Sequence, residues 1–431
     1  MKKLAAALAV LALALCFAAA RASADNVQFG VNDNAGFYGA SQFWSSLTGL
    51  NLRVNTIILR WNEASANGFD GIDGQFVAHA VQAAAAAGVK LEFDVSPRHS
   101  AELSDQGGPT KFAAWLTKLA TTYPSVTSYV VMNECNQDLF VNPQVQNGHN
   151  ISAAECGAFL AAGYDALKAV NPSIFVWGLG LSPRGNVPNG GPQPSTDPID
   201  WLGYLGDWYR KSGRTKPLMD GLDLHPYPLP QTLPFATGYA DPHNYSVANL
   251  ARPYQAFYNA FNGTAQPTVG PGHLPVQLNE VGIQTTAKGP GYTGSENVVV
   301  GDEAYQARWY SQLVDAAECD ADITNVNIFK LVDEQSLAGW QSGLFYADWT
   351  AKASAQAVRD EIAKDAGRCP TGQATYWAPG ATVAGGVAQD KAAKTTKTSS
   401  HKATKPKAGK AKHPKSSHGK KPHGQKPQKQ H

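Results

Sequence analysis

The stretch Ser128-Tyr-Val-Val-Met-Asn133-Glu134 guides the interpretation of the whole chain. Its residues 129–132 run without a polar break, which is typical of a parallel strand that is buried on both faces. An amide and a carboxylate then follow at the carboxyl end of this strand. The same order recurs downstream, where the short, largely apolar run 274–278 leads into Asn279 and Glu280. The chain therefore repeats one arrangement, a buried strand that ends in a glutamate.

Strand and helix patterns alternate through residues 27–364. Short apolar runs between turn residues predict eight strands, and a longer helical pattern follows each of them. Eight strand-helix units indicate an α/β fold, a (β/α)8 TIM barrel. A doubly wound open sheet is the alternative, but the Gly-x-Gly-x-x-Gly turn that usually follows its first strand is absent from this sequence. The expected strands are 27–31, 54–60, 90–95, 128–132, 174–177, 221–224, 275–278 and 326–331, and the expected helices are 41–50, 76–87, 111–122, 152–170, 199–211, 247–261, 303–317 and 351–364.

The two ends of the chain differ in composition from this repeating part. Lys2 and Lys3 precede the apolar run 4–20 and the small residues 22–24, which predicts a secretory signal peptide over residues 1–24. A transmembrane anchor is the alternative, but the run is short for a membrane span. We expect the barrel over 25–370, a linker rich in Gly, Ala and Thr over 371–390, and a disordered tail over 391–431. This organisation predicts a secreted protein, extracellular or associated with the cell wall, with no membrane span after cleavage.

The net charge of +2 conceals two parts of opposite charge. Residues 391–431 contain thirteen lysines, five histidines and no acidic residue. Without this tail and the three basic residues of the leader, 20 of the 36 Lys and Arg remain against 34 Asp and Glu. The folded part is therefore acidic, which argues against a specific nucleic-acid partner. The tail is expected to be a solvated extension, and the alternative is that it binds an anionic cell-wall polymer.

Four cysteines remain outside the leader. An even number in an exported chain favours disulfide bonds over metal ligands or reactive thiols. Three pairings are possible, and we favour Cys135 with Cys156 and Cys319 with Cys369, because each pair joins neighbouring elements. The first bond would brace the loop that follows Glu134.

Polar side chains at the ends of the expected strands form a candidate site. The carboxyl ends of all strands of a parallel barrel meet at one mouth, so we expect Glu134 and Glu280 to face each other across it. Retaining hydrolysis of a glycosidic bond needs two carboxyl groups about 5 Å apart, one protonated and one ionised. Arg60 closes the second strand, and His225 and Tyr227 follow the sixth. Each of these three residues alone is more often structural, but together they predict a carbohydrate-cleaving site that needs no metal or cofactor.

The motifs at these strand ends resemble those of the clan A retaining glycoside hydrolases, including the cellulase-type family 5 and the family 39 group. The resemblance rests on Asn133-Glu134, His225-x-Tyr227, Asn279-Glu280-Val-Gly282 and a closing segment from Asp333 to Lys352. It covers residues 26–366.

The resemblance implies a role for each residue of the candidate site. Glu134 would be the acid/base and Glu280 the nucleophile. Arg60 and Tyr227 would position the nucleophile, and Asn133 and His225 would bind the sugar at the cleavage subsite.

The sequence also departs from the pattern of this clan. Cys135 stands where the clan has a proline, and Lys330 lies near the place of a tryptophan platform, for which Trp340 is the expected substitute. The predicted function is a secreted retaining β-glycoside hydrolase that acts on a poly- or oligosaccharide. The alternatives are a catalytically silent carbohydrate- or wall-binding protein and a transglycosylase.

Overall fold

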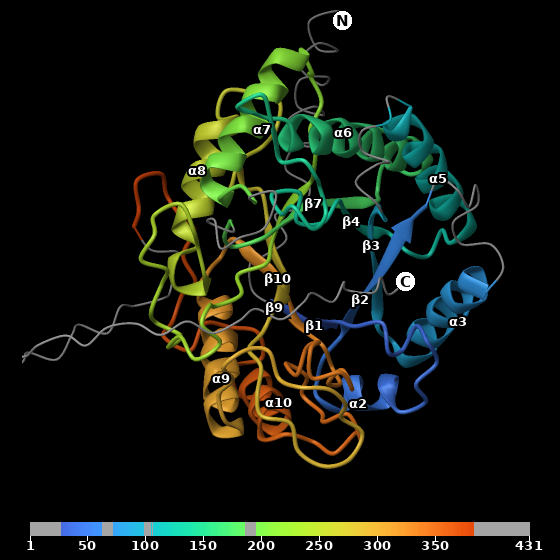
Figure 1. The fold of residues 1–431 in the computed structure, drawn as a ribbon, viewed down its shortest axis with the longest axis vertical. Coiled ribbons are helices and arrows are strands. Elements are labelled where there is room, and N and C mark those ends of the chain that lie inside the picture. Colours follow the sequence, from blue (N-terminus) through green and yellow to red (C-terminus); the bar gives the residue numbers. More distant parts are fainter. Residues whose placement is uncertain (1–26, 63–71, 99–104, 106, 186–194, 383–431) are drawn as a thin grey trace, which may run out of the picture. The chain divides into compact units, whose positions relative to one another are not determined.

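In the computed structural model, which describes residues 27–62, 72–98, 105, 107–185 and 195–382, eight parallel strands close into a barrel (Figure 1). Around the barrel the strand order is β1-β10-β9-β8-β7-β4-β3-β2. The predicted (β/α)8 fold is therefore confirmed. The strands are β1 Gln28–Asn32, β2 Val54–Trp61, β3 Lys90–Pro97, β4 Ser128–Val131, β7 Phe175–Leu181, β8 Gly221–Leu224, β9 Val276–Val281 and β10 Ile323–Phe329.

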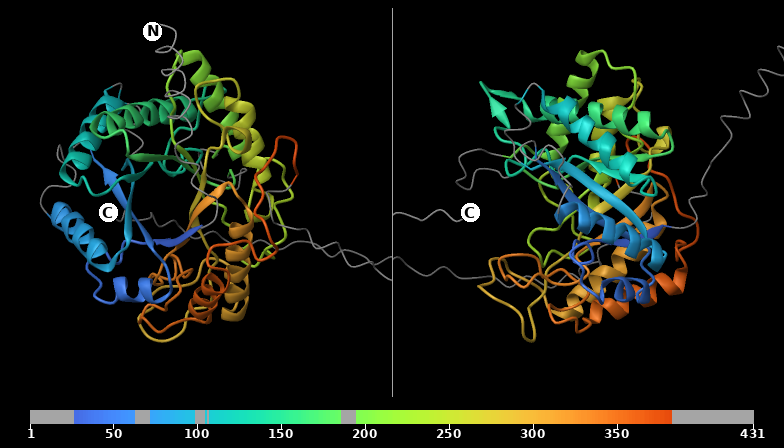
Figure 2. Two further views of the ribbon diagram at one scale, coloured as in Figure 1. Left: turned by 180° about the vertical axis from the view of Figure 1, so that it is seen from behind. Right: turned by 90° about the vertical axis from the view of Figure 1, so that its right-hand side faces the viewer.

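A ring of helices surrounds the barrel, as Figure 2 shows in its left view. Each helix follows a strand in the chain and packs an apolar face against the barrel wall. The helices are α2 Phe43–Gly49, α3 Ile72–Ala87, α5 Gly108–Thr122, α6 Ser152–Val170, α7 Pro198–Ser212, α8 Ala251–Phe261, α9 Glu303–Cys319 and α10 Ala353–Asp365.

Local sequence signals explain where these helices begin and end. Asp302 caps α9 by accepting a hydrogen bond from the amide of Tyr305 at 2.7 Å. Pro198 opens α7, and Gly213 ends it in the left-handed conformation that glycine adopts at low cost. These signals place most helix ends within a few residues of the prediction.

The structure differs from the prediction mainly at three elements. β7 extends four residues beyond the expected strand, to Leu181, through a kink at Leu179 and Gly180. The expected helix 247–261 is divided into a 3-10 turn, Val247–Asn249, and α8. A short hairpin that was not predicted, β5 Val145–Gln146 and β6 His149–Asn150, lies in the loop after β4.

The interior of the barrel is polar, although barrels of this kind are usually filled by branched apolar side chains. At its centre Glu92 is fully buried and accepts hydrogen bonds from three different strands. Thr56 Oγ1 donates at 2.9 Å, Ser128 Oγ at 2.6 Å and Gln277 Nε2 at 2.8 Å. Asn327 extends this network to Thr56 and Asn279. Directional bonds thus join strands on opposite sides of the barrel below the mouth.

Both predicted disulfide pairings are confirmed. Cys135 pairs with Cys156 at the start of α6, with 6.2 Å between the Cα atoms. Cys319 at the end of α9 pairs with Cys369, with 4.4 Å between the Cα atoms. The first bond joins the loop that carries Glu134 to a helix of the outer ring.

Residues beyond the predicted boundary at 370 also pack on the barrel. Trp377, expected in a linker, is buried, and its amide donates to Asp322 at 2.7 Å. Its ring contacts those of Tyr254 and Tyr258 on α8. The chain therefore packs on the barrel at least as far as Trp377, because this aromatic side chain has an apolar surface to cover. The predicted signal peptide and the tail lie outside the described residues, and none of the described helices has the length and hydrophobicity to span a membrane.

Candidate active site

The backbone at the end of β4 directs Glu134 into the mouth of the barrel. Met132 and Glu134 both adopt positive φ angles, 74° and 41°, which residues other than glycine rarely adopt. The amide of Glu134 donates to the carbonyl oxygen of Gly180 on β7 at 2.8 Å, which fixes this bend. Non-glycine residues in such conformations cluster at functional sites. The bend turns the carboxylate away from the barrel wall and toward the centre of the mouth.

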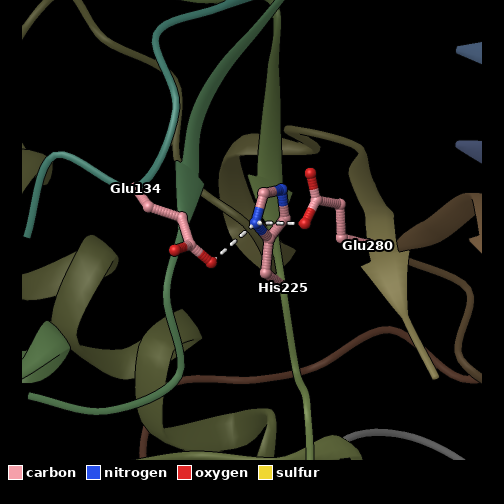
Figure 3. Close-up of side chains that lie close together, drawn as sticks. All are labelled: Glu134, His225 and Glu280. Carbon is pink, nitrogen blue, oxygen red and sulfur yellow. Dashed lines mark hydrogen bonds and ion pairs between the residues drawn. The ribbon is translucent and has the colours of Figure 1, made fainter. Parts of the chain in front are cut away.

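His225 lies between Glu134 and Glu280, as Figure 3 shows. Its Nδ1 lies 3.1 Å from Oε1 of Glu134 and 3.6 Å from Oε2 of Glu280. One oxygen of each glutamate and the ring nitrogen lie within 4.8 Å of one another. The structure therefore brings together the two glutamates that the sequence places at the ends of the fourth and seventh strands of the barrel.

Two neutral donors hold the carboxylate of Glu280. The hydroxyl of Tyr227 donates to Oε2 at 3.0 Å, and Asn32 Nδ2 donates to Oε1 at 3.4 Å. Tyr227 is buried, and burial raises the pKa of its hydroxyl well above the ordinary value, so it remains a donor at every physiological pH. Each carboxylate oxygen of Glu280 thus has its own donor, which fixes the orientation of the group.

Burial controls the protonation of the acidic groups around His225. It raises the pKa of Glu134, which the nearby His225 opposes. It raises the pKa of Asp223, which lies 3.6 Å from Nε2 of His225, to about 7. Burial lowers the pKa of His225 itself, but Glu280, Asp223 and Glu134 together raise it well above its usual value. The neighbouring carboxyl groups thus favour the charged form of His225, and burial favours the protonated form of Glu134.

Both glutamates line a cavity of about 490 Å³. Its wall comes from the loops that follow most of the strands, at the carboxyl end of the barrel. Arg60, Asn133, Tyr227 and Trp340, which the sequence selects as binding residues, lie in this wall. The other residues of the wall include Gln137, Asp138, Leu139, Phe140, Ser182, Pro183, Arg184, Leu229, Gln231, Tyr239, Gln284, Val298, Phe329 and Ala338.

Trp340 and Asn133 both line the cavity. Trp340 comes from the loop after β10, and its ring centroid lies 4.7 Å from that of Tyr227 and 5.2 Å from that of Phe329. It thus presents a partly exposed aromatic surface beside Glu280. Asn133 is nearly fully buried, and its Oδ1 has no hydrogen-bond partner among the described residues.

Arg60 and His225 both contact acidic groups of the site. Among the described residues, the guanidinium of Arg60 contacts Asp94 at 4.0 Å, the hydroxyl of Ser96 and the ring of Phe140, so it does not pair directly with Glu280. His225 is fully buried and lies outside the cavity wall. It contacts the carboxylates of Glu134 and Glu280 through Nδ1.

Lys330 is a salt-bridge partner rather than part of the cavity wall. Its Nζ lies 3.0 Å from Oε1 of Glu334, four residues further along the loop after β10. The same nitrogen lies 4.6 Å from the ring centroid of Phe329. The aromatic surface at this side of the cavity is thus Phe329 and Trp340.

Three buried residues of the site were not selected from the sequence: Asn32, Asp94 and Asp223. Burial raises the pKa of Asp94 to about 8, against the lowering effect of Arg60. A sequence signal does exist for two of them, because side chains two apart on a strand point to the same side. Asp94 follows Glu92 on β3, and Asp223 precedes His225 by two residues, so each shares the interior side with another polar residue.

Two groups of carboxylates in the described part of the chain have a spacing that suits a cation. The first is Glu134 and Glu280 with His225. The second is Asp315, Glu361 and Asp365 on α9 and α10, where the ammonium of Lys364 already lies 2.6 Å from Glu361 and 3.3 Å from Asp365. Neither group has a feature that requires a metal.

No protein-family model matches the sequence, and no curated protein matches it. Solved structures do match the fold. A family 39 glycoside hydrolase from the gut symbiont Bacteroides cellulosilyticus is 14% identical, with a TM-score of 0.51 over 78% of this chain and 64% of that one. The chain thus spans less than two thirds of the length of that protein.

Two further structures cover more of their own length. A glycoside hydrolase of family 5, subfamily 18, from Streptomyces cattleya, solved in complex with GlcNAc, is 16% identical, with a TM-score of 0.52 over 80% of this chain and 81% of that one. A family 1 β-glucosidase from Thermotoga maritima is 10% identical, with a TM-score of 0.51 over 79% of this chain and 98% of that one. The fold of this chain is therefore the barrel found in glycoside hydrolases of families 39, 5 and 1, as the resemblance in its motifs implied.

Proposed function

We propose that the protein is a retaining β-glycoside hydrolase. The observation that supports this most directly is the spacing of Glu134 and Glu280, which have carboxylate oxygens within 4.8 Å of each other. Retaining glycosidases hold their two carboxyl groups about 5 Å apart, whereas inverting enzymes leave about 6.5–9.5 Å for a water molecule. The short separation favours direct attack by one carboxylate on the sugar.

The environments of the two glutamates support a different role for each. Glu280 keeps both oxygens on the neutral donors Tyr227 and Asn32, an arrangement that favours a carboxylate. It attacks the anomeric carbon and forms a glycosyl ester, while the bond to the leaving oxygen breaks. Glu134, whose pKa is raised by burial, gives its proton to that oxygen. The ionised Glu134 then takes a proton from water, which attacks the anomeric carbon and releases Glu280.

The cavity wall supplies the remaining contacts to the sugar at the cleavage point. Asn133 has a buried amide oxygen that accepts no hydrogen bond from the described residues and can receive one from a sugar hydroxyl. Trp340 and Phe329 offer aromatic faces for the apolar side of the ring. His225 contacts both carboxyl groups through Nδ1 and so helps to orient them.

Two conservative variants test the roles of the glutamates. Glu280→Gln should lose turnover by at least a thousandfold on all glycosides, because no nucleophile remains. Glu134→Gln should be far less impaired on glycosides with an acidic phenol as leaving group, which needs no protonation, and added azide should restore its turnover with a β-glycosyl azide as product. Glu361→Gln, on α10, is the matched control. Proton NMR of the first product gives the stereochemistry, and an inverted anomer or an active Glu280→Gln variant would refute the proposal.

A catalytically silent carbohydrate-binding protein is the second candidate. It is favoured by the departures from the clan pattern, with Cys135 in a disulfide bond and Lys330 paired to Glu334. A panel of aryl glycosides and polysaccharides separates the two functions. Binding without release of reducing ends would support the silent protein, whereas a glycan product longer than the substrate would indicate a transglycosylase.

The proposed setting of this activity is the cell exterior. The leader over residues 1–24 and the two disulfide bonds support export. We propose that the thirteen lysines of the tail hold the protein on an anionic cell-wall polymer, because the tail has no acidic residue to oppose such binding.

A further inference from the structure

The loop that follows Glu134 presents apolar side chains at the rim of the cavity. Leu139 and Phe140 both line the cavity, and Leu139 is 82% exposed. Leu229, from the loop after β8, lines the same cavity and is also exposed. Exposed leucines are unremarkable when scattered singly. Here they lie along one cavity that contains two candidate catalytic groups.

The loop that carries Leu139 is held in place by several bonds. The disulfide bond between Cys135 and Cys156 ties its beginning to α6. Gln144 is buried, and its Nε2 donates to the carbonyl oxygens of Cys135 at 2.9 Å, Gln137 at 3.1 Å and Val141 at 2.7 Å. The exposed leucine therefore stands on a fixed support, so binding against it costs little ordering of the loop.

The proposed reaction indicates which part of the substrate lies next to this loop. Glu134 gives its proton to the leaving oxygen, so the leaving group lies on the side of Glu134. Leu139 and Phe140 follow Glu134 by five and six residues in one braced loop. Their side of the cavity is hence the side of the leaving group, whereas Glu280 and Trp340 belong to the sugar that is attacked.

The polar side chains of this loop are engaged within the protein. Gln137 Nε2 donates to the carbonyl oxygen of Arg184. Asp138 Oδ1 accepts a hydrogen bond from Ser195 Oγ at 2.6 Å. A second sugar would need several directional partners for its hydroxyls, and Nε2 of Gln137 and Oδ1 of Asp138 are already used within the protein. An apolar group needs only the area that Leu139, Phe140 and Leu229 expose.

We propose that the leaving group of the natural substrate is apolar, so that the substrate is a glycoside of an alkyl or aryl alcohol and not an internal bond of a polysaccharide. This inference rests on the proposed function for the assignment of the two sides of the cavity. It replaces the polysaccharide expected from the sequence with a smaller, amphiphilic class of substrate.

A homologous series of substrates tests the proposal. Once a panel of aryl glycosides has identified the sugar, the methyl, butyl and octyl β-glycosides of that sugar and its disaccharide are compared below the micelle concentration. Their leaving alcohols have similar acidity in the alkyl series, so kcat/KM reports binding of the chain. We expect kcat/KM to rise on the order of tenfold or more from methyl to octyl, as burial of several methylene groups predicts.

Substitution of Leu139 tests whether this residue causes the preference for the octyl glycoside. Leu139→Ser should reduce the octyl-to-methyl ratio of kcat/KM several-fold. Val145→Ser is the matched control, because Val145 is also exposed, at 39%, on the same loop but does not line the cavity. An equal rate for methyl and octyl glycosides, a preference for the disaccharide, or an unchanged ratio in Leu139→Ser would overturn the inference.

Binding of the octyl and methyl glycosides to Glu280→Gln, measured by calorimetry, separates this inference from the proposed function. Tighter binding of the octyl glycoside that depends on Leu139, together with a wild-type protein that turns over no glycoside, would refute hydrolysis and support the apolar site. Turnover without such a preference would support hydrolysis and refute the apolar site.

Discussion

Behind the two glutamates, the carboxyl groups of Asp94 and Asp223 are fully buried and near positive charges. A buried carboxylate without full pairing is costly, so these groups hold protons to higher pH than exposed ones. Asp223 lies against His225, and His225 contacts both glutamates. The protonation of Asp223 is thereby connected, through one imidazole ring, to the acid of the proposed reaction.

Asp223→Asn should move the alkaline limb of the pH profile to higher pH. Without the negative charge at Nε2, the pKa of His225 falls, and the ring is charged for less of the time. The positive charge that opposes protonation of Glu134 is then weaker, so the pKa of Glu134 rises further. We expect the alkaline limb of the kcat/KM profile, measured over a pH series, to shift to higher pH by roughly one pH unit.

Asp322→Asn is the control for this experiment. Asp322 is a buried aspartate that accepts hydrogen bonds from the amides of Gly270 and Trp377, away from the cavity. Its substitution should leave the alkaline limb in place even if it lowers stability. A limb that stays fixed in Asp223→Asn, or moves to lower pH, would contradict the role given to Asp223.

Asp94 predicts a pH dependence of stability. Its carboxyl has a pKa of about 8 in the folded protein and an ordinary value of 3.8. Between these values the folded state holds the proton and the unfolded state releases it, so stability falls as the pH rises. The side chain of Asp94→Asn cannot titrate. The free energy of unfolding of this variant should therefore rise relative to that of the wild type by up to about 1.4 kcal/mol per pH unit in this window. Urea unfolding at pH 5 and pH 7 measures this difference, and a constant difference would disprove the assignment.

At the scale of residues, the sequence selects the two glutamates with Tyr227 and His225 beside them, but it does not select the buried Asn32, Asp94 and Asp223. Glu134 and Glu280 are recognisable because each follows an apolar strand, and a barrel brings all strand ends together. The partners of Arg60 depend on side-chain rotamers and on loop positions, which no spacing in the sequence defines. For that reason Arg60 contacts Asp94 in the structure and not the predicted Glu280.

At the scale of elements, the loop after β4 carries both the acid/base candidate and a disulfide bond. Removing that bond with Cys135→Ser and Cys156→Ser should cost about 3 kcal/mol of unfolding free energy for a loop of 21 residues, mainly through the unfolded state. Turnover should also fall, because Cys135 is adjacent to Glu134. Chemical denaturation and kcat measure the two effects.

The second disulfide bond provides the comparison. Cys319→Ser with Cys369→Ser opens a loop of 50 residues and should cost at least as much stability. This bond joins α9 to the segment after α10, so kcat should remain close to that of the wild type at temperatures where the protein is folded. Equal losses of kcat in both double variants would show that the first bond does not position Glu134.

The sequence predicts a strand or helix well where the spacing of its apolar residues and the turn residues at its ends indicate the same element. The eight strands and eight helices follow from such patterns, and the confirmed disulfide pairings follow from their order in the chain. The extension of β7 was not predictable, because the segment Gly178-Leu-Gly-Leu181 combines two glycines with a kink at positive φ. That kink has a reason in the site, since a methyl group at Gly180 would lie 3.1 Å from the ring of His225.

At the scale of the whole molecule, charge is divided between an acidic folded part and a basic tail. Removing residues 391–431 takes away thirteen positive charges and leaves the barrel sequence intact. We expect the shortened protein to bind isolated cell walls at least tenfold more weakly at low salt, and the binding of the full chain to fall toward the same level in 1 M salt. Hydrolytic rates on small glycosides should be the same for both. Equal binding by the two chains would refute retention by the tail.

The polar centre of the barrel has a consequence for how this protein tolerates sequence change. An aliphatic interior accepts many exchanges of similar volume, because dispersion forces have little directionality. Glu92 instead accepts hydrogen bonds from donors on three strands at once. Replacing any one of Thr56, Ser128 or Gln277 would therefore leave a buried polar atom without its partner. Substitutions there must come in compensating sets. The innermost part of this protein should accordingly diverge more slowly than the apolar layer between strands and helices.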